Sequence, residues 1–187
     1  MQERHFFGYG SLVNRRTHDY HRTLAATLPG WRREWRSTRL RDIAILSARP
    51  VPGGSIAGLI AEVPGDDWTA LDQREADYLR HDISATIQPA VPGPRHTQVY
   101  QVDPGIVRSP CDGAILLSYL DTVIQGFLDM GGAAAAAGFF ATTDGWARDV
   151  LDDRAAPIYP RATSLTAQER GIVDTALAAL PVRIRRP

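Results

Sequence analysis

The amino-acid sequence predicts an α+β fold: a small mixed β-barrel with flanking helices, followed by a helical C-terminal extension. Up to about residue 102, short runs of β-forming residues alternate with turns that contain proline and glycine. Beyond that point, apolar residues recur mainly at helical spacing. Strands followed by helices, without regular alternation of the two, are typical of α+β domains.

Most of the predicted strands lie in the first part of the chain. The first of them ends in the glycine-rich turn Gly8-Tyr9-Gly10-Ser11, and turns at residues 50–55 and 89–94 separate later strands. The expected strands cover residues 4–9, two stretches within 30–46, 56–63, 82–87 and 97–102.

Helices dominate the second part. Ile115, Tyr119, Val123 and Phe127 fall four residues apart and predict a helix that begins near Ser109-Pro110 and stops at Gly131-Gly132. The later expectations are a short helix or tight connection at 133–137, a helix at 145–152 capped by Thr143-Asp144, an extended piece at 155–161, and an amphipathic helix at 166–180 capped by Ser164 or Thr166.

The length of 187 residues suits one domain, which we divide into a core at residues 1–132 and an extension at 133–187 packed on it. Charge is balanced, with 21 basic and 21 acidic residues, so nothing indicates a nucleic acid or an anionic membrane as partner. The lone Cys111 cannot form an internal disulfide, and we expect it to be buried as a small hydrophobic residue. We expect a cytoplasmic monomer or homodimer.

The glycine turn is the first candidate functional motif. Closely spaced glycines allow successive backbone N–H groups to point the same way, and such nests bind anions. A dinucleotide fingerprint would need a glycine where Val13 stands, and a phosphate loop would need a lysine. The G-x-S-x-G elbow of a serine nucleophile is also excluded, because Tyr9 and Val13 stand where its two glycines would flank Ser11. A plain turn at the end of a strand remains the alternative.

The second candidate is Glu75, in a helix whose predicted N-cap is Asp66. Trp68, Leu71 and Tyr78 lie at helical spacing from Glu75, so the carboxylate projects from an apolar face. Burial raises the pKa of a carboxylate toward values useful in general acid–base catalysis.

Two other interpretations of these charged residues stay open. Glu75 could be a structural residue paired with Arg33, Arg80 or a backbone amide, and the neighbours Arg74 and Asp77 are expected on the solvent face of the helix. His18 and His21 are spaced for one helix face, but no cluster of cysteine, histidine and carboxylate completes a metal site. We therefore expect neither a metal nor a cofactor.

Taken together and in order, these motifs resemble the γ-glutamylcyclotransferase superfamily, which includes AIG2-like and ChaC-type proteins. Phe-Gly-Tyr-Gly-Ser-Leu at the end of a strand is followed some sixty residues later by Leu71-Asp72-Gln73-Arg74-Glu75. Gly30-Trp31-Arg32-Arg33 and residues 54–59 lie between them, and the segment from Ser109 to Gly131 resembles the closing helix of the family.

The resemblance implies a barrel-like α+β domain with a cavity at one mouth. It also implies that Glu75 is the catalytic carboxylate, and that the backbone of Gly10, Ser11 and Leu12 holds the γ-glutamyl group of a small-molecule substrate. By the same resemblance, Tyr9 shapes the floor, and Tyr78 and Tyr119 stand near the pocket tyrosines of the family.

The implied activity is cyclisation of a γ-glutamyl group to 5-oxoproline, with release of an amine, an amino acid or a dipeptide. The α-amine of the substrate is itself the nucleophile, so one carboxylate that moves protons and a turn that binds charge suffice. The alternatives are a catalytically silent binding module of the same fold and a hydrolase that uses Ser11.

The sequence departs from the family pattern in two places. Ala76 stands where members often have glycine after the catalytic carboxylate, and Leu12 matches ChaC-type proteins rather than those with asparagine at this position. Residues 139–161, rich in aromatic and arginine side chains, lie outside the resemblance. We expect this segment to cover the pocket and narrow substrate choice, with Arg154 or Arg161 reaching a substrate carboxylate.

Overall fold

The computed structural model describes residues 3–89, 95–109 and 112–186. The surroundings of Cys111 and most of the 89–94 turn lie outside these residues. The helix predicted to begin near Ser109-Pro110 begins instead at Leu117, because Ile115–Leu116 form a strand. The strands are β1 (Glu3–Gly8), β2 (Leu24–Ser37), β3 (Ala44–Glu62), β4 (Tyr78–Asp82), β5 (Arg95–Val102), β6 (Ile115–Leu116), β7 (Thr143–Asp144), β8 (Asp149–Leu151) and β9 (Arg183–Arg185).

Within the described residues, three α-helices and four 3₁₀ turns join these strands. The helices are α1 (Thr69–Arg74), α2 (Leu117–Ala141) and α3 (Ala167–Ala178), and the 3₁₀ turns are η1 (Ser11–Val13), η2 (Arg15–Thr17), η3 (Pro64–Asp66) and η4 (Pro104–Ile106).

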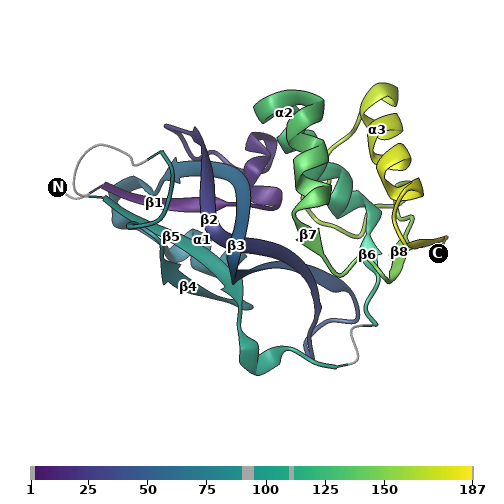
Figure 1. Ribbon diagram of the computed structural model, residues 1–187, viewed down its shortest axis with the longest axis horizontal. Coiled ribbons are helices and arrows are strands. Elements are labelled where there is room, and N and C mark those ends of the chain that lie inside the picture. Colours follow the sequence, from purple (N-terminus) through teal and green to yellow (C-terminus); the bar gives the residue numbers. More distant parts are fainter. Residues whose placement is uncertain (1–2, 90–94, 110–111, 187) are drawn as a thin grey trace.

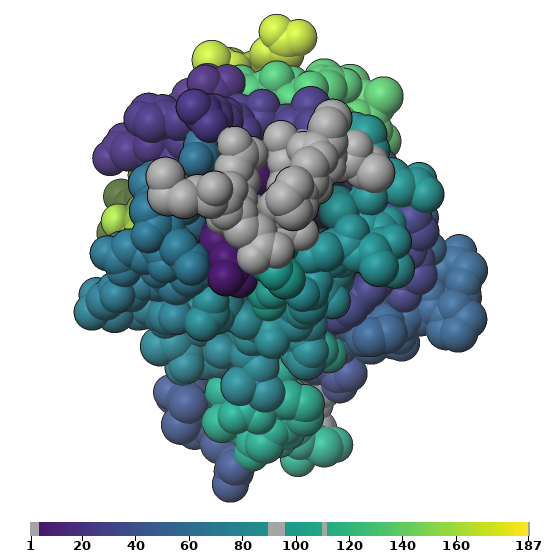
Figure 2. All heavy atoms as spheres, turned by 90° about the vertical axis from the view of Figure 1, so that its left-hand side faces the viewer, coloured from purple at the N-terminus to yellow at the C-terminus, as the bar shows by residue number. Residues whose placement is uncertain are grey.

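A six-stranded mixed sheet in the order β4-β5-β1-β3-β2-β7 forms the body of the molecule, and β6, β8 and β9 make a second, parallel sheet. The α+β fold predicted from the sequence is confirmed. The long strands β2 and β3 curve across the molecule, with α2 and α3 grouped at one end (Figure 1). Viewed from the opposite end, the surface is formed mainly by the first half of the chain, with the C-terminal residues near its edges (Figure 2).

The predicted turn at residues 50–55 is wrong, because these residues belong to one long strand, β3. In the pairing of β3 with β2, Trp31 lies opposite Pro50 and Pro29 lies opposite Ser55. The register therefore shifts between these pairs, and residues 51–54 of β3 face the single residue Gly30 of β2. The Pro/Gly composition therefore marks an irregularity within a hairpin rather than its end. The same Pro/Gly pattern suits a turn between two strands and an irregularity within one strand, and only the pairing with β2 distinguishes the two.

The helix around Glu75 is shorter than predicted. α1 ends at Arg74, Glu75 caps it, and Tyr78 begins β4, so the helical face ends at the carboxylate. Asp66 is not the N-cap, because it lies in η3 and accepts a hydrogen bond from the indole of Trp68. The strand predicted at 82–87 is wrong as well, because the observed strand β4 covers Tyr78–Asp82 and ends where the predicted one would begin. Pairing of β4 with β5 overrides the helical periodicity here.

The glycines Gly131 and Gly132 interrupt α2 as predicted, with backbone angles outside the helical region, and residues 133–137 continue as helix. The helix predicted at 145–152 is wrong, because Thr143–Asp144 and Asp149–Leu151 are strands. The last helix is confirmed: Thr166 caps α3, and its hydroxyl and the carboxylate of Glu169 form a reciprocal capping box.

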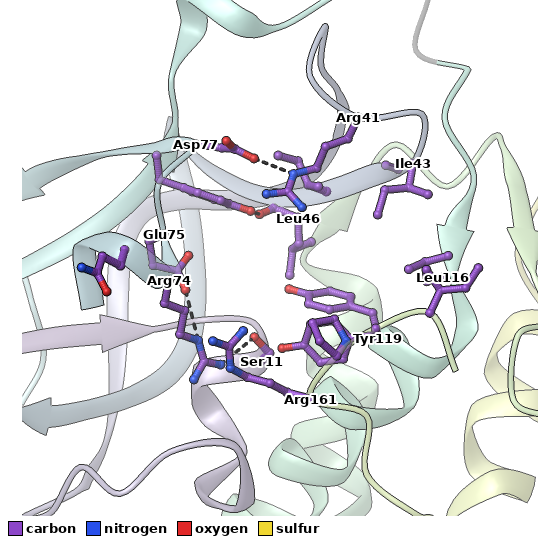
Figure 3. Close-up of a pocket in the computed structure, with 17 residues that line it drawn as sticks. Ser11, Arg41, Ile43, Leu46, Arg74, Glu75, Asp77, Leu116, Tyr119 and Arg161 are labelled. Carbon is purple, nitrogen blue, oxygen red and sulfur yellow. Dashed lines mark hydrogen bonds and ion pairs between the residues drawn. The ribbon is translucent and has the colours of Figure 1, made fainter. Parts of the chain in front are cut away.

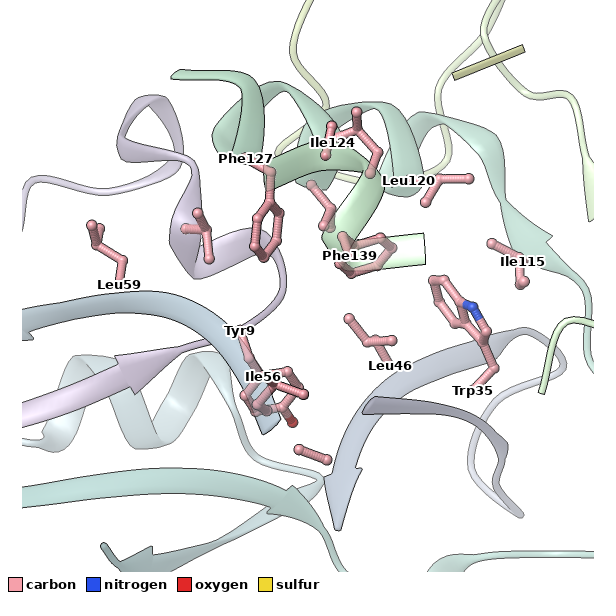
Figure 4. Close-up of a cluster of buried hydrophobic side chains, with 14 of the residues drawn as sticks. Tyr9, Trp35, Leu46, Ile56, Leu59, Ile115, Leu120, Ile124, Phe127 and Phe139 are labelled. Carbon is pink, nitrogen blue, oxygen red and sulfur yellow. The ribbon is translucent and has the colours of Figure 1, made fainter. Parts of the chain in front are cut away.

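The main hydrophobic core lies between the curled sheet and α2. Strand residues such as Trp35 and Leu46 pack there against Leu120, Phe127 and Phe139 (Figure 4). By length and composition α2 could also cross a membrane, a criterion that a buried core helix meets too. This core also includes residues beyond 132, among them Phe139, Trp146, Val173 and Leu177. The division of the chain at residue 132 stays a prediction.

A close backbone approach fixes α2 beside the glycine turn. A Cβ added to Gly126 would lie 2.6 Å from the backbone nitrogen of Asn14, so a larger residue would push the helix away. The buried amide of Asn14 donates to the carbonyl of Thr122 at 2.8 Å and to the side chain of Gln125 at 3.2 Å. These contacts set the distance between α2 and the first loop, and hence the width of the site between them.

Candidate active site

A pocket of about 410 Å³ opens between the sheet and the C-terminal half of the chain (Figure 3). A hollow of about 30 Å³ adjoins it beside the glycine turn. The residues predicted for catalysis and for binding the γ-glutamyl group all line this hollow: Tyr9, Gly10, Ser11, Leu12, Glu75, Tyr78 and Tyr119. Ser11, Glu75, Tyr78 and Tyr119 line the larger pocket as well, so hollow and pocket form one site.

The glycine turn begins where β1 ends. The N–H of Val13 donates to the carbonyl of Gly10 at 2.9 Å and closes the first 3₁₀ turn of η1. A Cβ on Gly10 would lie 2.8 Å from the hydroxyl of Tyr119, so only glycine leaves room for that tyrosine. The backbone of Ser11 is hydrogen-bonded to the same hydroxyl. The phenol of Tyr119 is therefore a further point of contact between the turn and α2.

Buried polar contacts hold the turn from behind. The Arg33 guanidinium, fully buried in β2, donates from Nε to the carbonyl of Tyr9 at 2.8 Å and from Nη1 to Thr142 at 2.7 Å. It lies 5.0 Å from the ring of Phe127, and burial lowers its pKa to about 9. The hydroxyl of Tyr9 donates to the carbonyl of Tyr100 at 2.6 Å. The hydroxyl of Tyr9 is thus bound within the fold, and the residue lines the hollow.

Glu75 stands at the junction of the hollow and the pocket, with 15% of its side chain exposed. Burial raises its pKa above the usual value, and the positive charges of Arg74 and Arg161 act against this shift. The proposed structural partners are wrong: Arg33 binds the turn, and Arg80 pairs with Asp72 at 3.2 Å. The ion pair formed instead joins the Glu75 carboxylate to Nε of Arg74 at 3.4 Å.

Arg74 and Asp77 correct the prediction that they face solvent. Only 8% of the Arg74 side chain is exposed, and its guanidinium donates to Oγ of Ser11 at 3.2 Å and to the carbonyl of Thr17 at 3.0 Å. Asp77 pairs with Arg41 at 2.6 Å at the pocket edge. Both were missed because the helix was predicted to continue. Its early end turns this stretch of chain toward the pocket.

Tyr78 and Tyr119 stand on opposite sides of the site. The hydroxyl of Tyr78, from β4, donates to the carbonyl of Leu46 at 2.9 Å. Tyr119, from α2, packs edge-to-face on Tyr159 with ring centroids 5.0 Å apart. Burial raises the pKa of both phenols well above the usual value, so they stay neutral and act as hydrogen-bonding groups.

The far wall comes from residues 158–161, in the segment that the sequence singled out. Asp153, 1% exposed, shapes it by accepting from the N–H of Ser118 at 2.8 Å, its hydroxyl at 2.5 Å and the N–H of Ile158 at 2.9 Å. Arg154 does not reach the pocket, because Asp121 and Asp174 bind it. Of the two arginines proposed to reach a substrate, Arg161 lines the pocket.

Neither histidine of the early loop belongs to a metal site in the part of the chain that the structure describes. His18 bonds the carbonyl of Leu12 at 3.0 Å and packs near Tyr20, and no group of three potential ligands gathers among the described residues. The polar side chains that line the pocket are mainly arginines, carboxylates and phenols, together with Ser11 and Gln73. These can bind anions and move protons.

The geometry can be compared with solved structures. A structure described as a gamma-glutamyl cyclotransferase is 13% identical over 93% of this chain and 99% of that chain, with a TM-score of 0.57. An uncharacterized protein from Homo sapiens is equally identical over the same shares, with a TM-score of 0.58. YkqA from Bacillus subtilis matches at 14% identity and a TM-score of 0.54, over 98% of this chain and 57% of that chain.

At these identities the likeness establishes the fold, and it confirms the γ-glutamylcyclotransferase-like fold expected from the sequence motifs. No protein-family model matches the chain, and no curated protein sequence matches it. The chemistry must therefore be argued from the site.

Proposed function

We propose that this protein is a γ-glutamylcyclotransferase-type enzyme that converts a γ-glutamyl compound to 5-oxoproline and releases an amine, an amino acid or a dipeptide. One observation carries the proposal: a mostly buried carboxylate, Glu75, stands where the hollow beside the glycine turn meets the larger pocket. A γ-glutamyl group bound beside the glycine turn, across the hollow and the adjoining part of the pocket, would have its γ-carbonyl near Glu75 and its leaving group farther out in the pocket.

The reaction needs no nucleophile from the protein. The substrate α-amine, after loss of a proton, attacks the γ-carbonyl carbon and forms the ring C–N bond. The ring nitrogen then loses a further proton, the C–N bond to the leaving group breaks, and the released amine takes up both protons and departs as an ammonium. Glu75 accepts each proton from the attacking nitrogen and passes it to the leaving nitrogen, so the carboxylate is regenerated. Its raised pKa suits both steps, because a weakly basic carboxylate would not take the proton from an ammonium.

The walls of the hollow supply the remaining requirements. An amine and a carbonyl of one flexible substrate must be folded together, and the floor and tyrosines restrict it to the folded form. Charge that develops on the carbonyl oxygen requires hydrogen-bond donors nearby. The neutral phenol of Tyr119 and the backbone of the turn are the candidate donors, because the hydroxyl of Tyr78 already donates to the carbonyl of Leu46. We further propose that the protein works without a cofactor, in the cytoplasm, as a monomer or homodimer.

Direct assay for 5-oxoproline tests the function. Purified protein is incubated with glutathione, γ-glutamyl amino acids and γ-glutamyl amines, and the product is quantified by mass spectrometry. We expect product from the wild type and almost none from Glu75→Gln. Glu62→Gln is the matched control, because Glu62 pairs with Arg22 outside the pocket. Thermal denaturation shows that each variant is folded.

Failure to form product from any donor, by folded wild-type protein, would contradict the proposal. Binding of the same compounds in that case would support a silent module of this fold. A hydrolase that uses Ser11 predicts another outcome, loss of activity in Ser11→Ala but not in Glu75→Gln. The hydroxyl of Ser11 instead accepts from Arg74, and the described residues that line the pocket include no histidine to activate it.

A further inference from the structure

The arginines that line the pocket differ in how far their charges are compensated. Arg41 is bound by Asp77 at 2.6 Å, and Arg74 is bound by Ser11, Thr17 and Glu75. Arg161 also lines the pocket but forms no hydrogen bond or ion pair with the residues that the structure describes. The pocket therefore contains one guanidinium that is free to bind an anion.

Arg161 is solvent-exposed and at the same time lines the pocket. Figure 3 shows its side chain reaching from the wall formed by residues 158–161, which we call the C-terminal wall, toward Arg74 and Ser11. Its charge also opposes the upward pKa shift of Glu75, which places it within electrostatic reach of the proposed catalytic group. The backbone below it is held, because Asp153 fixes Ile158 and the ring of Tyr159 packs on Tyr119.

The position of Arg161 along the substrate follows from the site's shape. The part that becomes the ring must lie beside the turn, because its amine has to reach the γ-carbonyl at Glu75. Gly10 and Leu12 at the turn are buried, whereas Arg161 is exposed at the mouth. The group beyond the breaking C–N bond extends toward the mouth and so meets Arg161. Its surroundings there, Ile158 and Pro160, contribute no charge.

We propose that Arg161 binds a carboxylate on the leaving group, so that the substrates are γ-glutamyl amino acids or peptides rather than γ-glutamyl amines. This inference rests on the proposed function. A planar guanidinium binds a carboxylate through two parallel hydrogen bonds, which lysine cannot reproduce. An uncharged substituent on the leaving amine would offer no anion for the solvent-exposed guanidinium of Arg161 to bind.

The test uses two donors that differ by the carboxylate alone, γ-glutamylalanine and γ-glutamylethylamide. For each we measure kcat/KM from 5-oxoproline formation in wild type, Arg161→Gln and Arg161→Lys. We expect the wild type to prefer γ-glutamylalanine by at least about tenfold, which corresponds to about 1.4 kcal/mol. Arg161→Gln should abolish most of this preference through KM, and Arg161→Lys should keep part of it.

A control separates the site from general charge. Arg170→Gln removes one positive charge from an exposed position on α3 that does not line the pocket. We expect the donor preference of this variant to equal that of the wild type. A drop as large as that of Arg161→Gln would attribute the effect to the overall field and overturn the inference. An equal loss of kcat/KM for both donors in Arg161→Gln would also overturn the inference, because Arg161 would then contact the γ-glutamyl group that the two donors share.

Binding measured without turnover separates failure of this inference from failure of the proposed function. Calorimetry with Glu75→Gln, alone and combined with Arg161→Gln, gives the affinity for both donors even if neither is cyclised. Tighter binding of γ-glutamylalanine that disappears with Arg161→Gln supports the inference. Equal affinities for the two donors overturn it, whether or not 5-oxoproline forms in the wild type.

Discussion

The two walls of the pocket are built differently. On the N-terminal wall, the turn, Arg74 and Glu75 are tied to one another and to the loop at Thr17 by hydrogen bonds and an ion pair. On the C-terminal wall, Tyr159 and Arg161 extend from a loop held at its base by Asp153, and no described residue binds the guanidinium of Arg161.

The difference separates two tasks that an enzyme of this type must perform. Groups that move protons need a fixed position within a few tenths of an ångström, which cross-linked side chains provide. A group that selects the leaving group needs hydrogen-bond donors that no protein group already occupies, and an arginine in an ion pair does not offer them. We therefore expect variants of the N-terminal wall to lower kcat for every donor, and variants of the C-terminal wall to change mainly the choice among donors.

The largest expected effect is that of Glu75→Gln. Loss of a general acid–base group lowers kcat by about 10²–10⁴-fold. Because proton transfer is common to all donors, the loss should be the same for γ-glutamylalanine and γ-glutamylethylamide. Steady-state kinetics with both donors measures it. A loss confined to one donor would assign Glu75 to selection and break the proposed division between the walls.

Gly10→Ala is expected to act next. The new methyl group would meet the hydroxyl of Tyr119 at 2.8 Å and a methyl of Leu46 at 3.1 Å, so the phenol must shift. We expect kcat/KM to fall by about tenfold or more, since one misplaced group in a site is costly. Tyr119→Phe removes the clashing oxygen, so the double variant should lose less than the sum of the two single losses. Additive losses would show that the clash is not the cause.

A smaller effect is expected for Asp153→Ala. It leaves the N–H groups of Ser118 and Ile158 without their buried acceptor, which costs about 1–3 kcal/mol of unfolding free energy. The loosened loop should raise KM for γ-glutamylalanine more than it lowers kcat. Urea denaturation and kinetics check both parts. Asp129→Ala, which removes an exposed pair with Arg16, should change stability by less than about 1 kcal/mol.

The smallest effect concerns pH and stability. Since folding raises the pKa of Glu75 above 4.5, the folded protein holds this proton more tightly than the unfolded chain. The contribution of Glu75 to stability is therefore fully present below pH 4.5 and is lost as the pH rises through the folded pKa. Glu75→Gln should gain stability relative to the wild type between pH 4.5 and pH 7, as measured by urea denaturation across this range. A constant difference would contradict the shift.

Several local features could be predicted because neighbouring residues decide them. The turn after β1, the break at Gly131 and Gly132, and the cap of α3 at Thr166 all depend on a few adjacent residues. The candidate site also followed from short motifs: Tyr9 to Leu12, Glu75, Tyr78 and Tyr119 line one hollow, and their catalytic and binding roles stay predictions.

Other features escaped prediction because distant parts of the chain decide them. Residues 50–55 continue β3 because β2 pairs alongside, and Tyr78 is in a strand because β5 is available to it. Arg33 is buried, although arginine on a strand usually lies at the rim, because a backbone carbonyl, Thr142 and two aromatic rings surround it.

By itself, the sequence determined the class of fold, the glycine turn and the carboxylate on which the proposed chemistry rests. Only the tertiary structure decided that Arg74 turns inward, that Arg154 is bound elsewhere, and that Arg161 faces the pocket. The physical reason is that charged side chains are long and their energies depend on which partners lie within reach. Folding brings together partners that lie far apart in the sequence, such as Arg74 and Ser11 at a separation of 63 residues, and no local pattern contains them.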